Sequence, residues 1–317
     1  MRRGTQEWGL VGSTEYVEDD SLRLTHSAVA YLNLDVSADG PNFGAAGSPS
    51  LRATLRDIAR VAPNPDSAGK SVFDVWRANA TNVDSLGPKF GDPGGGSDFA
   101  GFANHLGIPI IEYGFTGFGG VYHSAYDDYA WLSRFGDPGF IHHAAAARVG
   151  AALLLRLANA DVIPYDYVEY AHTMRRYLPA LDESIRAKNW SASTAPLATA
   201  IDGMASAASA FAAARDAALA GGTPSSATLR STNAALLRVE RALTRPAGLR
   251  TRPWFRSLIY AADEDNGYAN IALPSVAEAI RAGDVSLTTR EIADLASRFD
   301  AAAAALKDAT EAIGKKS

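Results

Sequence analysis

The sequence predicts an α/β domain followed by an all-α helical bundle, and three observations support this prediction. Two nearly continuous apolar runs, 27–35 and 108–115, have the length and composition of buried strands. Helix-patterned segments alternate with these runs through the first 135 or so residues, as in α/β domains. From Asp137 onward the chain is rich in alanine at helical spacing and contains no convincing strand, which is typical of a helical bundle.

Four helical segments are expected in the α/β part. Ser13 is placed to cap the first, because a serine side chain accepts a hydrogen bond from the first turn of a helix. Pro63 ends the second and Gly107 ends the fourth, since both residues commonly follow the last turn. The expected segments are 12–24, 48–62, 72–76 and 98–106.

Five longer helical patterns follow, separated by segments that contain proline or glycine. These patterns are 142–160, 165–188, 195–220, 227–244 and 288–313. The connection 250–268 is too aromatic and apolar to be only a solvated loop. We therefore predict two domains, 1–160 of α/β class and 161–317 of helical class.

Composition excludes several classes of protein. The net charge of -5, without a block of lysine or arginine, gives no electrostatic reason to bind nucleic acid. No charge-free apolar run of membrane-spanning length is found, and Met1-Arg2-Arg3 is not followed by one, so neither a membrane segment nor a signal peptide is expected. The absence of cysteine excludes disulfides, thiolate metal sites and a cysteine nucleophile, but leaves the compartment unknown.

Glu7, Asp35 and His123 are the candidate metal ligands. Carboxylate and imidazole groups suit zinc, and each of the three lies at the end of an expected strand or in a loop, where α/β sheets bind ligands. Taken singly, each residue is better explained as a solvated charge or an ordinary loop histidine. Their separations match no compact zinc signature.

Four motifs change this balance, because they occur in a characteristic order and spacing. They are Glu7–Tyr16, Ala30–Asp35, Gly95–Phe99 and Tyr122–Tyr129. Together they resemble the M28 zinc peptidases of the glutamate carboxypeptidase II and transferrin receptor branch. The helical part, including Pro253–Tyr260, is similar to the dimerisation domain of that branch, so the resemblance spans essentially the whole chain. It implies a partial mixed-sheet peptidase domain joined to a helical domain that forms a homodimer.

The resemblance also implies metal-binding roles. Glu7, Asp35 and His123 correspond to three protein ligands of a two-zinc site, in which the metals polarise a peptide carbonyl and activate a water molecule. Glu15 and Glu18 correspond to acids that help to bind a structural calcium ion in some members. A solvated helix face explains these two acids equally well.

Substrate-binding roles follow from the same resemblance. Tyr122 and Tyr268 correspond to tyrosines that line the pocket and bind the substrate carboxylate, and Gly96 and Ser97 to a loop that holds the substrate backbone. Gly267 stands where glutamate-selective members place a lysine. Peptides are thus the expected substrates, without a preference for acidic residues. Family members are often secreted or anchored to membranes.

Two departures from the family pattern argue against activity. The family's other two ligands, a histidine and a bridging aspartate, precede the motif that here begins six residues into the chain. The general base is a glutamate, and Gln6 stands at its position; an amide cannot accept the proton of the attacking water.

We therefore expect an N-terminally truncated zinc exopeptidase that is inactive as an isolated chain. A non-catalytic homologue acting as a binding or dimerisation module is the main alternative, and a degenerating gene without function is a third. Loss of sheet neighbours should also leave an exposed apolar edge on the α/β part.

Overall fold

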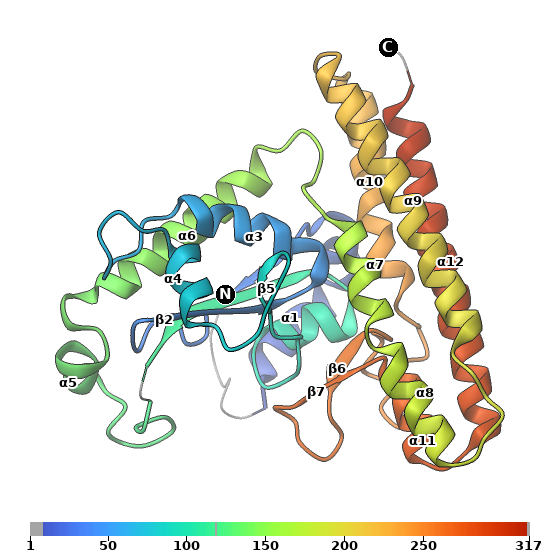
Figure 1. Ribbon diagram of the computed structural model, residues 1–317, viewed down its shortest axis with the longest axis horizontal. Helices are drawn as coiled ribbons and strands as arrows, with labels where there is room; N and C mark the ends of the chain where they lie inside the picture. Colours follow the sequence, from blue (N-terminus) through green and yellow to red (C-terminus); the bar gives the residue numbers. More distant parts are fainter. Residues whose placement is uncertain (1–8, 118, 316–317) are drawn as a thin grey trace.

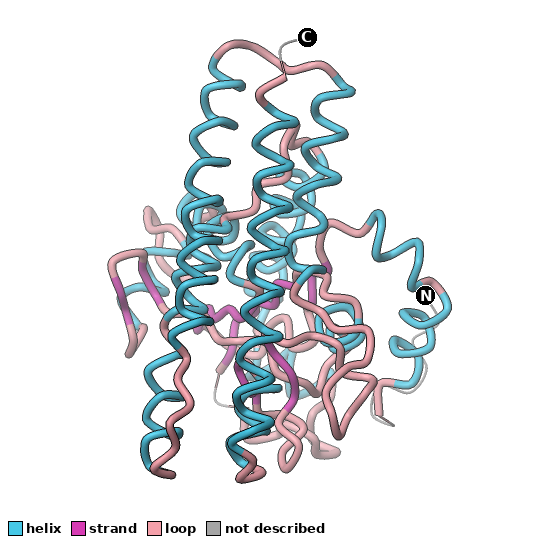
Figure 2. Tube along the Cα trace, turned by 90° about the vertical axis from the view of Figure 1, so that its right-hand side faces the viewer, coloured by secondary structure: helices cyan, strands magenta, loops and turns pink. Residues whose placement is uncertain are grey.

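The computed structural model describes residues 9–117 and 119–315, and within them a mixed sheet with helices precedes a part built from long helices (Figure 1). This arrangement agrees with the predicted fold class at the level of its two components. The long helices α9 (Ala195–Ala220), α10 (Ser226–Ala242) and α12 (Val285–Ile313) run side by side along one flank of the molecule, as both orthogonal views show (Figure 2).

The main sheet has the strand order β1-β5-β2. Its central strand β5 (Ile110–Thr116) is parallel to β1 (Tyr31–Asn33) and antiparallel to β2 (Asn42–Gly47). Both predicted apolar runs therefore contain strands of this sheet. β2 was not expected, because four of its six residues are glycine or alanine, which give it a weak strand propensity.

Short helices and two minor strands surround this sheet. In chain order they are α1 (Val11–Asp19), α2 (Ser21–Ser27), α3 (Pro49–Val61), α4 (Val72–Asn79), β3 (Val83–Asp84), β4 (Gly87–Pro88), the π-helical turn η2 (Gly101–His105), α5 (Tyr129–Trp131), the π-helical turn η3 (Leu132–Gly136), the 3-10 turn η4 (Pro138–Phe140) and α6 (Ile141–Ala158).

The remaining elements form the helical part. They are α7 (Tyr167–Arg175), α8 (Leu178–Ala187), α9 (Ala195–Ala220), α10 (Ser226–Ala242), β6 (Tyr260–Ala262), β7 (Asn270–Ala272), α11 (Pro274–Arg281) and α12 (Val285–Ile313). Strand β6 lies within the connection 250–268, which was expected to be more than a loop, and pairs with β7, just after it, in an antiparallel hairpin. The expectation that no strand occurs in this part is therefore wrong.

Three local predictions also need correction. Ser13 lies inside α1 and donates its hydroxyl to Leu10 O at 3.1 Å, so it does not cap the helix, and the single helix expected over 12–24 is divided into α1 and α2. The segment expected as one helix over 165–188 is divided into α7 and α8, with a proline in the first turn of α8. The helix expected over 98–106 is a π-helical turn.

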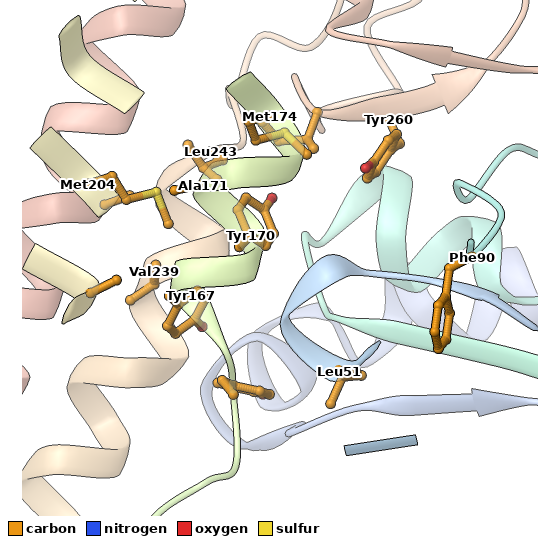
Figure 3. Close-up of a cluster of buried hydrophobic side chains, with 14 of the residues drawn as sticks. Leu51, Phe90, Tyr167, Tyr170, Ala171, Met174, Met204, Val239, Leu243 and Tyr260 are labelled. Carbon is orange, nitrogen blue, oxygen red and sulfur yellow. The ribbon is translucent and has the colours of Figure 1, made fainter. Parts of the chain in front are cut away.

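Helix α7 lies between the long helices and the α/β part, and its side chains fill the space on both sides (Figure 3). Tyr170 and Met174 are almost fully buried there, in the same hydrophobic cluster as Leu51 of α3 and Met204 of α9. Two buried polar contacts cross the same region. Ser50 of α3 donates a hydrogen bond to Glu240 of α10, and Arg56 of α3 pairs with Glu169 of α7.

Two helices, 138–158 and 195–220, are long and apolar enough to span a bilayer by length and composition alone. The expectation that the chain carries no membrane segment is therefore not confirmed. Such helices are weak evidence for a membrane span, because core helices of soluble proteins share these properties. Helix α9 packs against α7 and α12 in the folded chain.

Candidate functional site

A cleft of about 610 Å³ collects five of the predicted site residues. Asp35, Gly96, Tyr122, His123 and Tyr268 all line it, although they come from four separate segments of the chain. The cleft lies beyond the carboxyl end of β1, which is where α/β sheets commonly bind ligands.

Asp35 follows β1 by two residues and is held by a short hydrogen-bond chain. The Ser97 hydroxyl donates to Asp35 Oδ2 at 2.7 Å, and the Asn33 amide donates to the same hydroxyl oxygen at 3.0 Å. Asn33 and Ser97 are buried, whereas Asp35 is exposed to the cleft. Ser97 thus orients the carboxylate, and this contact was not anticipated from the sequence.

Glu112 lies on β5 directly opposite Asn33. Burial raises the pKa of its carboxyl group, a hydrogen bond from Asn33 lowers it, and the nearby Asp35 charge raises it further. The charged form of Glu112 is therefore disfavoured beside Asp35.

Gly96 and Tyr268 pack directly on each other. Gly96 has φ +80°, a backbone conformation that favours glycine, and a Cβ atom at this position would lie 2.7 Å from the Tyr268 ring. Tyr268 belongs to the β6–β7 connection, and Asn270 of β7 anchors that hairpin by donating its side-chain amide to Asp92 O at 3.0 Å. The hairpin of the helical part therefore supplies one wall of the cleft.

Tyr122 and His123 stand in the loop after β5. Their rings stack with centroids 3.9 Å apart and an interplanar angle of 15°. His123 has φ +57°, which is uncommon for a residue other than glycine and frequent at functional sites. Tyr122 is 56% exposed, so its hydroxyl group is accessible to a ligand in the cleft.

An Asp–His cluster beside the cleft was missed by the sequence analysis. Asp137 is fully buried, and its two carboxylate oxygens lie 2.8 Å from His142 Nδ1 and 2.7 Å from His143 Nδ1. Burial alone raises the pKa of Asp137, but the hydrogen bonds from His143 and His142 outweigh it and hold that pKa at about 2. His142 Nε2 also lies 2.7 Å from Asp66 Oδ2, and His143 lines the cleft. The signal for this cluster was the Asp137-Pro138 turn followed by two histidines at the start of a helix.

The fit of this site to zinc rests on part of the predicted ligand set. Asp35 and His123 supply suitable oxygen and nitrogen donors in one cleft, whereas Glu7 and the base position Gln6 lie outside the described residues. Within 9–117 and 119–315, no group of three acidic or histidine side chains is arranged to hold a metal. These residues therefore do not complete a zinc site by themselves.

The predicted calcium ligands are likewise not part of a group of three metal-binding side chains among the described residues. Glu15 and Glu18 are both exposed on α1, and Glu18 Oε1 accepts a hydrogen bond from the Trp254 indole at 2.6 Å. Glu18 therefore already links α1 to the connection that precedes β6. The structure offers no additional observation in favour of calcium.

Comparison with known proteins connects these observations to two families. The family model "Peptidase family M28" matches residues 4–145, and "Transferrin receptor-like dimerisation domain" matches residues 192–307. The chain is 35% identical over 275 residues to "Probable glutamate carboxypeptidase LAMP1" of Arabidopsis thaliana, an alignment that covers 87% of this chain and 39% of the relative.

Two further relatives give the same result. "Probable glutamate carboxypeptidase VP8" of Zea mays is 34% identical, with coverage of 91% of this chain and 40% of the relative. "Aminopeptidase NAALADL1" of Rattus norvegicus is 28% identical, with coverage of 98% and 43%. The chain thus spans about two fifths of the length of these curated relatives.

Proposed function

Because the chain belongs to peptidase family M28, in the branch that carries a transferrin receptor-like dimerisation domain, we propose that its cleft is the substrate site of a zinc-dependent exopeptidase. Such an enzyme removes the terminal residue of a small peptide, at its carboxyl or its amino end. The observation that carries the proposal is the convergence of Asp35 and His123 with Gly96, Tyr122 and Tyr268 on one cleft.

In this proposal Asp35 and His123 are zinc ligands together with Glu7. Bound zinc would supply Lewis-acid polarisation of the peptide carbonyl and a more acidic water. Ser97 supports the first ligand, because its hydroxyl donates a hydrogen bond to one Asp35 oxygen. Such outer contacts set the direction of a metal-binding lone pair.

The proposal gives the remaining cleft residues to the peptide. Tyr122 and Tyr268 are 56% and 64% exposed, and their hydroxyl groups can donate hydrogen bonds to a substrate carboxylate. Gly96 lines the cleft and is assigned to the backbone of a bound peptide, whereas Ser97 is buried beside it and acts through Asp35. Gly267 lines the cleft without a side chain, which supports a substrate without an acidic side chain.

For the quaternary structure we propose a homodimer formed through the helical part, with the domain boundary near residue 160. The match of the dimerisation family to residues 192–307 supports this assignment. Binding of calcium by Glu15 and Glu18 remains a hypothesis that rests on the family resemblance alone.

We further propose that the 317-residue chain alone does not hydrolyse peptides. Gln6 occupies the position of the general base, and its amide cannot accept a proton from water. The same residue favours the second candidate function, a non-catalytic member that uses the cleft for binding and the helices for dimerisation.

Metal titration and peptide hydrolysis test this proposal together. We expect zinc to bind the chain only weakly, His123→Ala and Asp35→Ala each to weaken that binding by roughly tenfold or more, and Glu311→Ala, which removes an exposed carboxylate on α12, to leave it unchanged. Identical zinc binding by all four proteins would refute the metal site. Turnover of a dipeptide panel by the unaltered chain would refute the role given to Gln6.

A further inference from the structure

His143 is held in a defined orientation on the wall of the cleft. Its Nδ1 atom lies 2.7 Å from Asp137 Oδ2, and its backbone N–H donates to the same oxygen at 2.9 Å. A carboxylate only accepts hydrogen bonds, so Nδ1 carries the ring proton in this contact. In the neutral ring Nε2 is then an acceptor, an assignment that rests on the hydrogen-bond network.

The Nε2 atom of His143 has no hydrogen-bond partner among the described residues, and the ring is partly exposed where it lines the cleft. The neighbouring His142 differs, because both of its ring nitrogens face carboxylates, Asp137 at 2.8 Å and Asp66 at 2.7 Å. His142 therefore fixes the start of α6, while His143 presents an acceptor to the cleft.

Other groups that line the cleft also accept hydrogen bonds. Asp39 accepts the Gly117 N–H on Oδ1 at 2.8 Å, no hydrogen bond to its Oδ2 is found among the described residues, and Asp127 is exposed at the cleft. No lysine or arginine is found among the described residues that line the cleft. A carboxylate beside His143 would therefore meet acceptors and negative charge in this cleft, whereas a protonated amine would find complementary partners.

We propose that His143, oriented by Asp137, receives the free amino group of a bound peptide. The amino group donates a hydrogen bond to Nε2, while the negative charges of Asp39 and Asp127 favour its positive charge. Tyr122 and Tyr268 then hold the other end of the same peptide, an assignment that rests on the proposed function. The cleft would thus select short peptides by their amino terminus.

Peptide binding to the metal-free chain tests the proposal by calorimetry at about pH 7, where an α-amino group with an ordinary pKa of about 7.7–8.0 is mostly protonated. The probes are alanyl-alanine amide, which has a free amine, and its N-acetylated form, which lacks it. The main variant is His143→Phe, which keeps a ring of similar shape without nitrogen. His172→Phe, an exposed histidine on α7 outside the cleft, is the matched control.

We expect the free-amine peptide to bind the unaltered chain and the control variant equally, and to bind His143→Phe about tenfold more weakly, the effect of losing one charged hydrogen bond. The acetylated peptide should bind at least about tenfold more weakly to the unaltered chain and be insensitive to His143→Phe. Asp137→Asn should weaken the binding of the free-amine peptide and leave that of the acetylated peptide unchanged. Imidazole ¹⁵N spectra of the unaltered chain should show His143 protonated at Nδ1, and this measurement does not depend on whether either variant folds.

Equal affinity for both peptides, binding of neither peptide, or an unchanged affinity in His143→Phe would overturn the proposal. These outcomes are separate from the test of the proposed function. A chain that binds zinc through Asp35 and His123 but ignores the amino group refutes only the role of His143. A chain that discriminates the amino group but binds no zinc refutes only the metal site.

Discussion

Glu240 is a buried acid whose titration should destabilise the fold near neutral pH. It lies on α10 with 8% of its surface exposed and accepts a hydrogen bond from Ser50 of α3. Burial raises its pKa to about 7, although the Ser50 hydrogen bond and the positive charge of Arg241 lower it. The folded chain therefore prefers the protonated, uncharged form of Glu240.

The sign and size of the effect follow from this difference. The unfolded chain ionises Glu240 near the ordinary value of 4.5, whereas the folded chain retains the proton up to about pH 7. The stabilising contribution is fully present below about pH 4.5 and is lost as pH rises through about 7. Since each pKa unit corresponds to about 1.4 kcal/mol, the ionised form costs the folded state about 3 kcal/mol.

The substitution Glu240→Gln isolates this contribution, because glutamine has a similar shape and stays neutral at every pH. We expect both proteins to have similar free energies of unfolding at about pH 4.5, and the variant to be more stable by about 3 kcal/mol above about pH 8. Urea unfolding at a series of pH values measures the difference. Burial also raises the pKa of Glu278, but that residue is present in both proteins and cancels in the comparison.

A matched control is Glu311→Gln, which changes an exposed glutamate on α12. When plotted against pH, its free energy of unfolding should run parallel to that of the unaltered chain. Parallel curves for Glu240→Gln as well would show that Glu240 is not held neutral by the fold, and the reasoning from burial would fail.

Two further predictions concern the packing of α3, α7 and α12. Arg56→Met should lower the free energy of unfolding by about 3–5 kcal/mol, because it leaves the buried Glu169 carboxylate unpaired. Adding Glu169→Leu should restore most of that loss, and an Arg56→Met variant as stable as the unaltered chain would contradict this prediction. Phe299→Ala should lower the free energy of unfolding by about 3–5 kcal/mol, because it opens a cavity at a fully buried position, whereas Asp300→Ala at the exposed next position should change it by less than about 0.5 kcal/mol. Equal losses for the two variants in urea unfolding would refute the packing argument.

Long periodic segments were predictable from the sequence because their burial pattern repeats over many turns. Helix α9 occupies the predicted range 195–220, and α3 differs from its prediction by one residue at each end. Strand β5 was recognisable as an apolar run because it is the central strand of the sheet.

Strand β2 was not predictable, because its small residues are needed for close packing against β5 and give no strand pattern in the sequence. A Cβ atom at Gly47 would lie 2.6 Å from Ile110 O, so glycine permits the close pairing with β5 that defines the strand. The hairpin β6–β7 was hidden for a similar reason. Each of its strands has three residues, too few for a period to be visible.

The candidate site was predictable only through the family resemblance, since Asp35, His123 and Tyr268 lie far apart in the chain. The structure places Asp35 and His123 on one cleft with Tyr268, but their roles stay predictions. The pairing of Asp137 with His143 escaped notice because it depends on the turn between them. Phe140 adopts φ +56° in that turn, and hydrophobic periodicity in the sequence does not predict such a conformation.

The contact between Gly96 and Tyr268 limits how this protein can be divided or recombined. The α/β part contributes Gly96, which has no side chain, and the Tyr268 ring from the β6–β7 connection of the helical part packs against it. A chimera that exchanged the helical part for another scaffold would keep the proposed zinc ligands Glu7, Asp35 and His123 and still lose a wall of the cleft. The proposed dimer interface and this wall belong to the same helical part, so any graft of the α/β part must carry the β6–β7 hairpin with it.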